Sequence, residues 1–159
     1  MNKTAIYPGS FDPFTNGHLD IVKKSSRLFE KVYIVIGINA NKKRTYNPFL
    51  IKNSIEETLL ENKIHNCEVV VYEGLIAKYT KENNICYMIR GLRNNLDYNY
   101  EENIAEINKL INPNLEYVYF RAENVAVSSS MVKELNSFGM SVSEFVPIAV
   151  QKIMSEDLN

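Results

Sequence analysis

The sequence predicts a doubly wound α/β domain built on a parallel sheet. Short β-rich runs alternate with helical stretches along the chain, which is the pattern of repeated strand–helix–strand units. The runs at 32–36 and 69–71 are continuously apolar, as expected of strands buried on both faces of a parallel sheet. A length of 159 residues fits one domain, and we expect residues 1–159 to form it.

Each element follows from a local pattern. Strands are expected at 4–7, 32–38, 68–72, 86–89 and 116–120. The first helix follows Gly17 and carries an apolar stripe between Ile21 and Phe29. The longest helix has its stripe between Leu96 and Ile111 and is ended by Pro113. Shorter helices are expected at 55–60, 75–81, 131–135 and 148–154.

Composition excludes several classes of function. The net charge is −1, with 18 basic and 19 acidic residues, so the broad basic surface of a nucleic-acid binder is not expected. No apolar run approaches the roughly 18 residues of a membrane span, and the N-terminal apolar stretch stops at Pro8, which predicts no signal peptide. Cys67 and Cys86 fit two buried thiols in a reducing compartment, so we expect a cytoplasmic protein.

The loop after the first strand, residues 7–18, is the first candidate site, because ligands of doubly wound folds bind beyond the carboxyl ends of strands. It contains neither a dinucleotide fingerprint nor a P-loop. It leads into a helix N-terminus, which attracts anions, and Gly17 permits close approach of a phosphate. His18 precedes Ile21 by three residues and shares its face; it is either a capping or core histidine or a neutral imidazole that donates to a phosphate.

Three further strand ends offer groups that suit phosphate oxygens. Lys42-Lys43-Arg44 follows the second strand, and Arg90-Gly91-Leu92-Arg93 follows the fourth. The alternative for the lysine loop is solvated surface charge. Ser128-Ser129-Ser130 begins a helix, where the alternative is a plain N-cap.

The sequence offers no paired histidines at metal-ligand spacing, no nucleophile elbow and no Cys–His pair. We therefore expect direct transfer of a phosphoryl-type group by positioning and charge stabilisation, without a covalent intermediate and without a protein ligand for a metal.

The motifs YPGSFDP at 7–13, TNGH at 15–18, IRGLR at 89–93 and VSSSMVK at 127–133, together with Lys42 and Tyr100-Glu101, resemble those of the bacterial phosphopantetheine adenylyltransferases, a family of nucleotidyltransferases. The resemblance covers nearly the whole chain. It implies a Rossmann-like five-stranded parallel sheet of order 3-2-1-4-5. It also implies adenylyl transfer from ATP to 4′-phosphopantetheine in coenzyme A synthesis, with Mg2+ as cofactor and a homohexameric assembly.

The same resemblance implies residue roles. His18, Lys42 and Arg90 would be catalytic, and Ser10, Lys42, Ile76 and Arg90 would bind the pantetheine substrate. Contacts to ATP are implied for Ser10, Phe11, His18, Gly91, Leu92, Arg93, Glu101, Asn124, Val125, Ala126, Val127, Ser128, Ser129 and Ser130.

Two departures from the family pattern stand out. The Glu-Arg pair that relatives carry after the lysine loop is absent from residues 49–53, and the chain has no tryptophan near 123–126. Two rival functions also stay open. A sister transferase would act on nicotinamide mononucleotide or a polyol phosphate, and the pattern of pyrophosphate release with each acceptor separates it. A nucleotide-binding sensor would bind ATP without releasing pyrophosphate.

Overall fold

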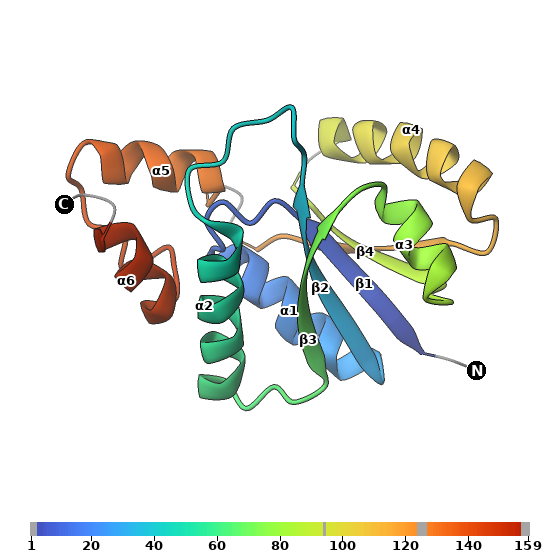
Figure 1. The fold of residues 1–159 in the computed structure, drawn as a ribbon, viewed down its shortest axis with the longest axis horizontal. Coiled ribbons are helices and arrows are strands. Elements are labelled where there is room, and N and C mark those ends of the chain that lie inside the picture. The colour runs from blue at the N-terminus through green and yellow to red at the C-terminus, as the bar shows by residue number, and fades with distance from the viewer. Residues whose placement is uncertain (1–2, 94, 124–126, 157–159) are drawn as a thin grey trace.

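A five-stranded parallel sheet organises the chain, as the computed structural model shows for residues 3–93, 95–123 and 127–156. Its strands are β1 (Thr4–Gly9), β2 (Lys31–Ile38), β3 (Cys67–Glu73), β4 (Tyr87–Leu92) and β5 (Glu116–Arg121). They are ordered β3-β2-β1-β4-β5 and every pairing is parallel (Figure 1). This confirms the predicted fold class and strand order.

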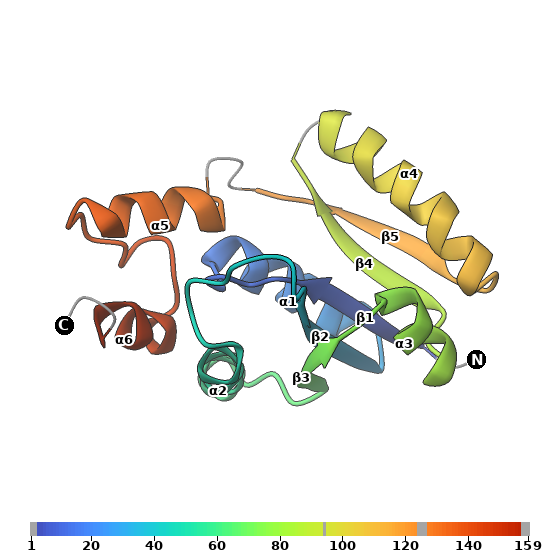
Figure 2. The same cartoon turned by 45° about the horizontal axis from the view of Figure 1, so that its top comes forward.

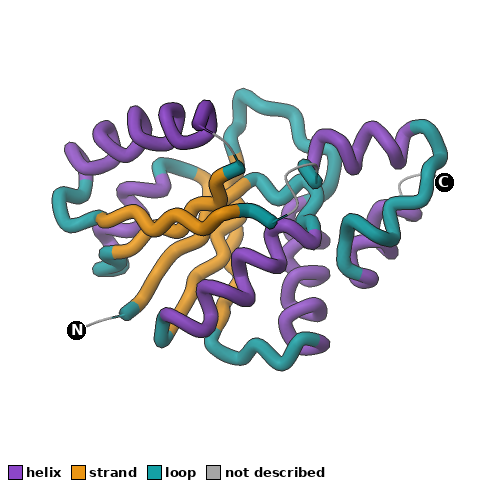
Figure 3. The backbone as a smooth tube through the Cα atoms, turned by 180° about the vertical axis from the view of Figure 1, so that it is seen from behind, coloured by secondary structure: helices purple, strands orange, loops and turns teal. Residues whose placement is uncertain are grey.

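The helices are α1 (Asn16–Leu28), α2 (Pro48–Glu61), α3 (Ile76–Glu82), α4 (Asn95–Ile111), α5 (Ser129–Ser137) and α6 (Ile148–Glu156). The larger apolar core packs one sheet face against α1, α2, α5 and α6, and a smaller core lies on the other face under α3. In the view from behind, α1 lies in front of the strands (Figure 3). Helices α5 and α6 lie side by side at one end, away from α4 (Figures 1 and 2). No described helix is long and apolar enough to cross a membrane.

One helix begins earlier than the sequence pattern predicts. Helix α2 starts at Pro48 instead of near residue 55, because the Asn47 side chain caps it by accepting the Phe49 N–H at 2.9 Å, and proline suits the first helical position. Phe49 and Leu50 are exposed and break the apolar period in the first turn. The first turns of α2 thus contain residues 49–53, which were expected to precede the helix.

Strands β1 and β4 also run further than predicted, and they separate before they end. Only Ala5 with Tyr87 and Ile6 with Met88 pair across them, although β1 continues to Gly9 and β4 to Leu92. Pro8 suits a position beyond the last pair of the β1–β4 ladder because it has no N–H to donate to β4. Residues 90–92, predicted to follow the strand, stay within β4 because they remain paired with β5. The gap between β1 and β4 opens at the carboxyl end of the sheet.

Candidate functional site

A cavity of about 320 Å³ lies where β1 and β4 separate. Its walls come from the end of β1, the start of α1, the end of β4 and the start of α5. Segments far apart in the sequence therefore meet at one place, as expected for the switch point of a doubly wound sheet. The predicted site residues that line it are Ser10, Phe11, His18, Arg90, Gly91, Arg93, Val127, Ser128 and Ser129.

The loop after β1 is shaped by Phe11. This residue has a φ of 46°, in the left-handed region that larger side chains rarely adopt, and its ring is buried. The ring packs over Gly9, where an added Cβ would stand only 2.9 Å from Phe11 Cζ. It also meets the His18 imidazole edge to face, with ring centroids 4.9 Å apart. The strained turn thereby fixes one side of the histidine.

His18 caps α1, as one of the two sequence interpretations predicts, and it also lines the cavity, while donation to a phosphate stays a prediction. The Thr15 backbone N–H donates to His18 Nδ1 at 3.0 Å, and Thr15 Oγ1 accepts the His18 N–H at 3.4 Å, which completes a capping box. A backbone N–H can only donate, so Nδ1 must accept and the proton of the neutral ring stands on Nε2. Among the described residues, Nε2 has no protein partner.

The electrostatics of the site keep this imidazole neutral. Burial, and then the positive charges of Arg90 and Arg93, lower the pKa of His18 to about 4. At neutral pH the side chain is therefore an uncharged donor held in one tautomer. It can donate a hydrogen bond to an oxyanion without giving up a proton.

Two helix N-termini open at the cavity, since Thr15 caps α1 and Ser128 caps α5. The Ser128 hydroxyl accepts the Met131 N–H at 3.1 Å, which is the plain N-cap alternative of the sequence analysis. The Ser129 hydroxyl donates to Pro13 O at 2.8 Å. In this arrangement the backbone N–H groups that begin the helices, rather than these two hydroxyls, are the donors that suit an anion.

Arg90 closes the gap in the sheet. Its Nη1 donates to Pro8 O at 2.9 Å, across the point where the β1–β4 ladder has stopped. With Arg93 it gives the cavity positive charge, and the described lining residues include no carboxylate. The cavity is thus suited to polyanionic ligands.

The glycines of the site leave room on the cavity side. A Cβ added at Gly17 would meet Thr15 Oγ1 at 3.5 Å, and one added at Gly91 would meet Ile21 Cδ1 at 3.5 Å. Both are ordinary contacts, so packing within the protein does not require glycine at either position.

Other predicted site residues lie outside the cavity. Lys42 is exposed in the loop after β2, and Ile76 is half-buried against the smaller core at the start of α3. Leu92 and Ser130 do not line the cavity either. The Glu101 side chain and residues Asn124, Val125 and Ala126 lie outside the described part of the chain. The structure therefore leaves the roles of these residues as predictions.

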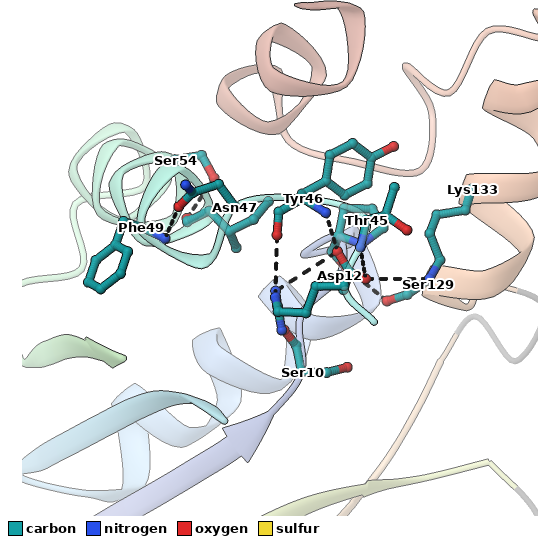
Figure 4. Close-up of polar contacts among 12 residues, drawn as sticks. Ser10, Asp12, Thr45, Tyr46, Asn47, Phe49, Ser54, Ser129 and Lys133 are labelled. Carbon is teal, nitrogen blue, oxygen red and sulfur yellow. Dashed lines mark hydrogen bonds and ion pairs between the residues drawn. The ribbon is translucent and has the colours of Figure 1, made fainter. Parts of the chain in front are cut away.

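The sequence analysis missed a buried carboxylate beside the cavity. Asp12 accepts the backbone N–H groups of Thr45 and Tyr46 at 2.9 Å each (Figure 4). Lys133 Nζ stands 3.5 Å from its Oδ2, and Arg44 Nη2 stands 3.9 Å from its Oδ1. The available signal was an acidic residue between Phe11 and Pro13 in an otherwise apolar turn, since a buried carboxylate requires partners.

The described residues include no group of three or more His, Cys, Asp or Glu side chains able to hold a metal ion. The charged side chains that line the cavity are those of Arg90 and Arg93, which repel a cation unless a bound anion brings it. The expectations of a Mg2+ cofactor and of no protein ligand for it therefore stay predictions.

Comparisons with known proteins identify the family of the chain. Residues 6–135 match the cytidylyltransferase-like family. The chain is 43% identical over 152 residues to the phosphopantetheine adenylyltransferase of Cytophaga hutchinsonii, covering 94% of this chain and all of the relative. It is 40% identical over 158 residues to that of Leuconostoc mesenteroides, covering 98% of this chain and 96% of the relative.

Solved structures share the fold at low sequence identity. A protein described as a nicotinate-nucleotide adenylyltransferase from Vibrio parahaemolyticus superposes with a TM-score of 0.70 at 13% identity, over 98% of this chain and 93% of the other. Nicotinic acid mononucleotide adenylyltransferase from Plasmodium falciparum gives 0.65 at 18% identity, over 99% and 97%. The chain belongs to the cytidylyltransferase-like family and, within it, to the phosphopantetheine adenylyltransferases.

Proposed function

We propose that this chain transfers the adenylyl group of ATP to 4′-phosphopantetheine, giving 3′-dephospho-coenzyme A and pyrophosphate, a step of coenzyme A synthesis. Family membership supports the reaction and both substrates. The positively charged cavity at the switch point supports the place where it happens. The observation that carries the proposal is the neutral His18 imidazole, held in one tautomer with Nε2–H as its remaining donor.

The chemistry is an in-line displacement at the α-phosphorus. An oxygen of the pantetheine phosphate forms a new bond to this phosphorus, and the bond from the phosphorus to the oxygen that bridges to the β-phosphate breaks. Pyrophosphate leaves with that electron pair. The attacking oxygen is already anionic, so no general base and no covalent enzyme intermediate are needed.

The protein acts by stabilising charge during this displacement. His18 Nε2–H donates to an α-phosphate oxygen as negative charge gathers there, and the α1 N-terminus adds its partial positive charge. The departing β- and γ-phosphates are received at the start of α5 by Ser129 and Ser130, where Ser129 contributes its backbone N–H because its hydroxyl already donates to Pro13 O. Arg90 orients the incoming phosphate, since its guanidinium presents a planar fork to two oxygens.

The remaining substrate contacts follow from the family pattern. Ser10, Lys42 and Ile76 join Arg90 in binding 4′-phosphopantetheine, and Lys42 places its charge beside the transferring phosphate. Phe11, Gly91, Leu92, Arg93, Glu101 and residues 124–128 complete the set that contacts ATP. The cavity lining supports these assignments for Ser10, Phe11 and Arg93 in particular.

Mg2+ enters as part of the MgATP substrate in this proposal. The absence of a carboxylate from the described cavity lining supports an ion carried by the triphosphate oxygens, instead of one held by the protein. No step of the displacement is assigned to a resident metal.

We also propose a homohexamer that works in the cytoplasm. Exposed apolar side chains on α4, with Ile107 60% and Leu110 84% accessible, support burial against another copy. The free thiols of Cys67 and Cys86 support a reducing compartment. Light scattering on the purified protein tests the assembly, and a monomer at working concentration would contradict it.

The reaction itself is tested by mixing purified protein with MgATP and 4′-phosphopantetheine and identifying the product by mass. Formation of 3′-dephospho-coenzyme A with an equal amount of pyrophosphate supports the proposal. Pyrophosphate release with nicotinamide mononucleotide or a polyol phosphate, and none with 4′-phosphopantetheine, would instead indicate a sister transferase. ATP binding without release from any acceptor would indicate a sensor.

A further inference from the structure

Asp12 connects three segments that are distant in the sequence. Its carboxylate accepts the N–H groups of Thr45 and Tyr46 in the loop between β2 and α2, and it lies 3.5 Å from Lys133 Nζ on α5. Asp12 itself belongs to the turn after β1, and it is buried. Figure 4 shows this carboxylate between the loop and the helix.

Arg44 fastens the same loop a second time. Its Nη1 donates to Ser10 O at 2.7 Å, and its Nε donates to Tyr46 O at 3.3 Å. Its Nη2 lies 3.9 Å from Asp12 Oδ1, and the Arg44 side chain is only 15% accessible. Although it is a cation beside a cavity suited to anions, Arg44 does not line that cavity. Its charged group is directed to the protein instead of a ligand.

The contacts of Asp12 and Arg44 lie next to Lys42, the predicted catalytic residue that does not line the cavity. Lys42 is exposed, and its backbone N–H donates to Asn39 O within its own loop. Two residues further on, Arg44 begins the stretch that is bound to the β1 turn. A short tether of this kind limits how far Lys42 can move from Ser10.

We propose that Arg44 is a positioning residue for adenylyl transfer, which holds the loop carrying Lys42 against the turn carrying Ser10. This inference rests on the proposed function, because it assigns Lys42 to the transferring phosphate. Asp12 supports this arrangement as the carboxylate that pairs with Arg44 at 3.9 Å and accepts the Thr45 and Tyr46 N–H groups, and its ion pair with Lys133 connects the loop to α5. Arg44, Asp12 and Lys133 thus affect the reaction without touching the substrates.

Double-mutant cycles test the inference. Arg44→Ala is expected to lower kcat about 10-fold to 10²-fold, since displacing a reacting group by about 1 Å has effects of that size. In a Lys42→Ala background the same change should lower kcat by less than about threefold, because the group it positions is gone. In a His18→Ala background the full loss from Arg44→Ala should persist. Arg27→Ala, at the exposed end of α1, is the control for removing an arginine.

Hydrogen exchange gives a second readout that does not depend on turnover. In Arg44→Ala, the Thr45 and Tyr46 amides should exchange at least about 10-fold faster, while amides in β2 keep their protection. Arg44→Lys is the variant to use if Arg44→Ala does not fold, because it keeps the charge but cannot donate to both Ser10 O and Tyr46 O. It should show the same changes in kcat and in amide exchange, with smaller magnitudes.

The outcomes separate the two proposals. If the unmodified protein makes no 3′-dephospho-coenzyme A, the proposed function fails. If the product forms but Arg44→Ala has the same kcat as Arg27→Ala, the positioning role is refuted while the function stands. The same conclusion follows if Arg44→Ala lowers kcat as much in the Lys42→Ala background as it does when Lys42 is present.

Discussion

Replacing His18 by asparagine separates its structural role from its chemical one. The Oδ1 of asparagine occupies the position of imidazole Nδ1, so it can still accept the Thr15 N–H that now bonds at 3.0 Å. Its Nδ2 falls where the ring has Cδ2, and nothing stands at the Nε2 position. The variant therefore keeps the α1 capping box and loses the donor that we assign to the α-phosphate.

The expected sizes follow from these contacts. His18→Asn should lower kcat by about 10²–10³-fold, the usual effect of removing one oxyanion donor, with its unfolding free energy within about 0.5 kcal/mol of the original protein. His18→Ala should lose the same activity and also about 0.5–1.5 kcal/mol of stability, because the Thr15 N–H then lacks its acceptor. Steady-state pyrophosphate release and urea unfolding measure the two effects. A folded His18→Asn protein with near-normal turnover would refute the reasoning.

Three further predictions follow from the site. Folding lowers the pKa of His18 from 6.5 to about 4, so the unfolded chain binds a proton at a higher pH than the folded protein does. The free energy of unfolding should therefore be highest above pH 6.5 and fall toward pH 4, by about 2 kcal/mol at pH 5. Urea unfolding of His18→Asn should lack that decrease. Gly17→Ala should fold normally, because its Cβ would lie 3.5 Å from Thr15 Oγ1, but should raise the KM for ATP; an unchanged KM would contradict close phosphate approach. Arg90→Ala should lower kcat/KM for 4′-phosphopantetheine by about 10²-fold, as the fork that holds the incoming phosphate is lost, and retained turnover would remove Arg90 from that role.

The sheet could be predicted from the sequence because its signals are local. The continuous apolar runs of β2 and β3 identify parallel strands, but only Val69 of the run at 69–71 is buried, because β3 is an edge strand. The strand order follows from the family resemblance that the loop motifs carry. The ends of elements were less predictable. Residues 90–92 stay in β4 only through pairing with β5, which is a contact between distant segments. The start of α2 depends on the Asn47 cap, a signal that the exposed Phe49 and Leu50 obscured.

The residues of the site were likewise predictable from the sequence only in part. His18 and Arg90 could be placed because His18 lies in the first turn of the helix that follows β1 and Arg90 lies at the carboxyl end of β4, and these two places meet in this fold. Asp12 could not, because its partners Thr45, Tyr46 and Lys133 are joined to it only by the folded chain. Ser129 was predicted to contact ATP, but the hydrogen bond that its hydroxyl donates to Pro13 O could not be predicted, because it depends on how α5 packs against the turn after β1.

The most direct test of the account is a structure of the protein with MgATP bound. We expect the α-phosphate to lie in the cavity between β1 and β4, with one of its oxygens within about 3.2 Å of His18 Nε2 and Nδ1 still accepting from Thr15. A triphosphate bound elsewhere, or an imidazole turned so that Nε2 meets only protein groups, would contradict it.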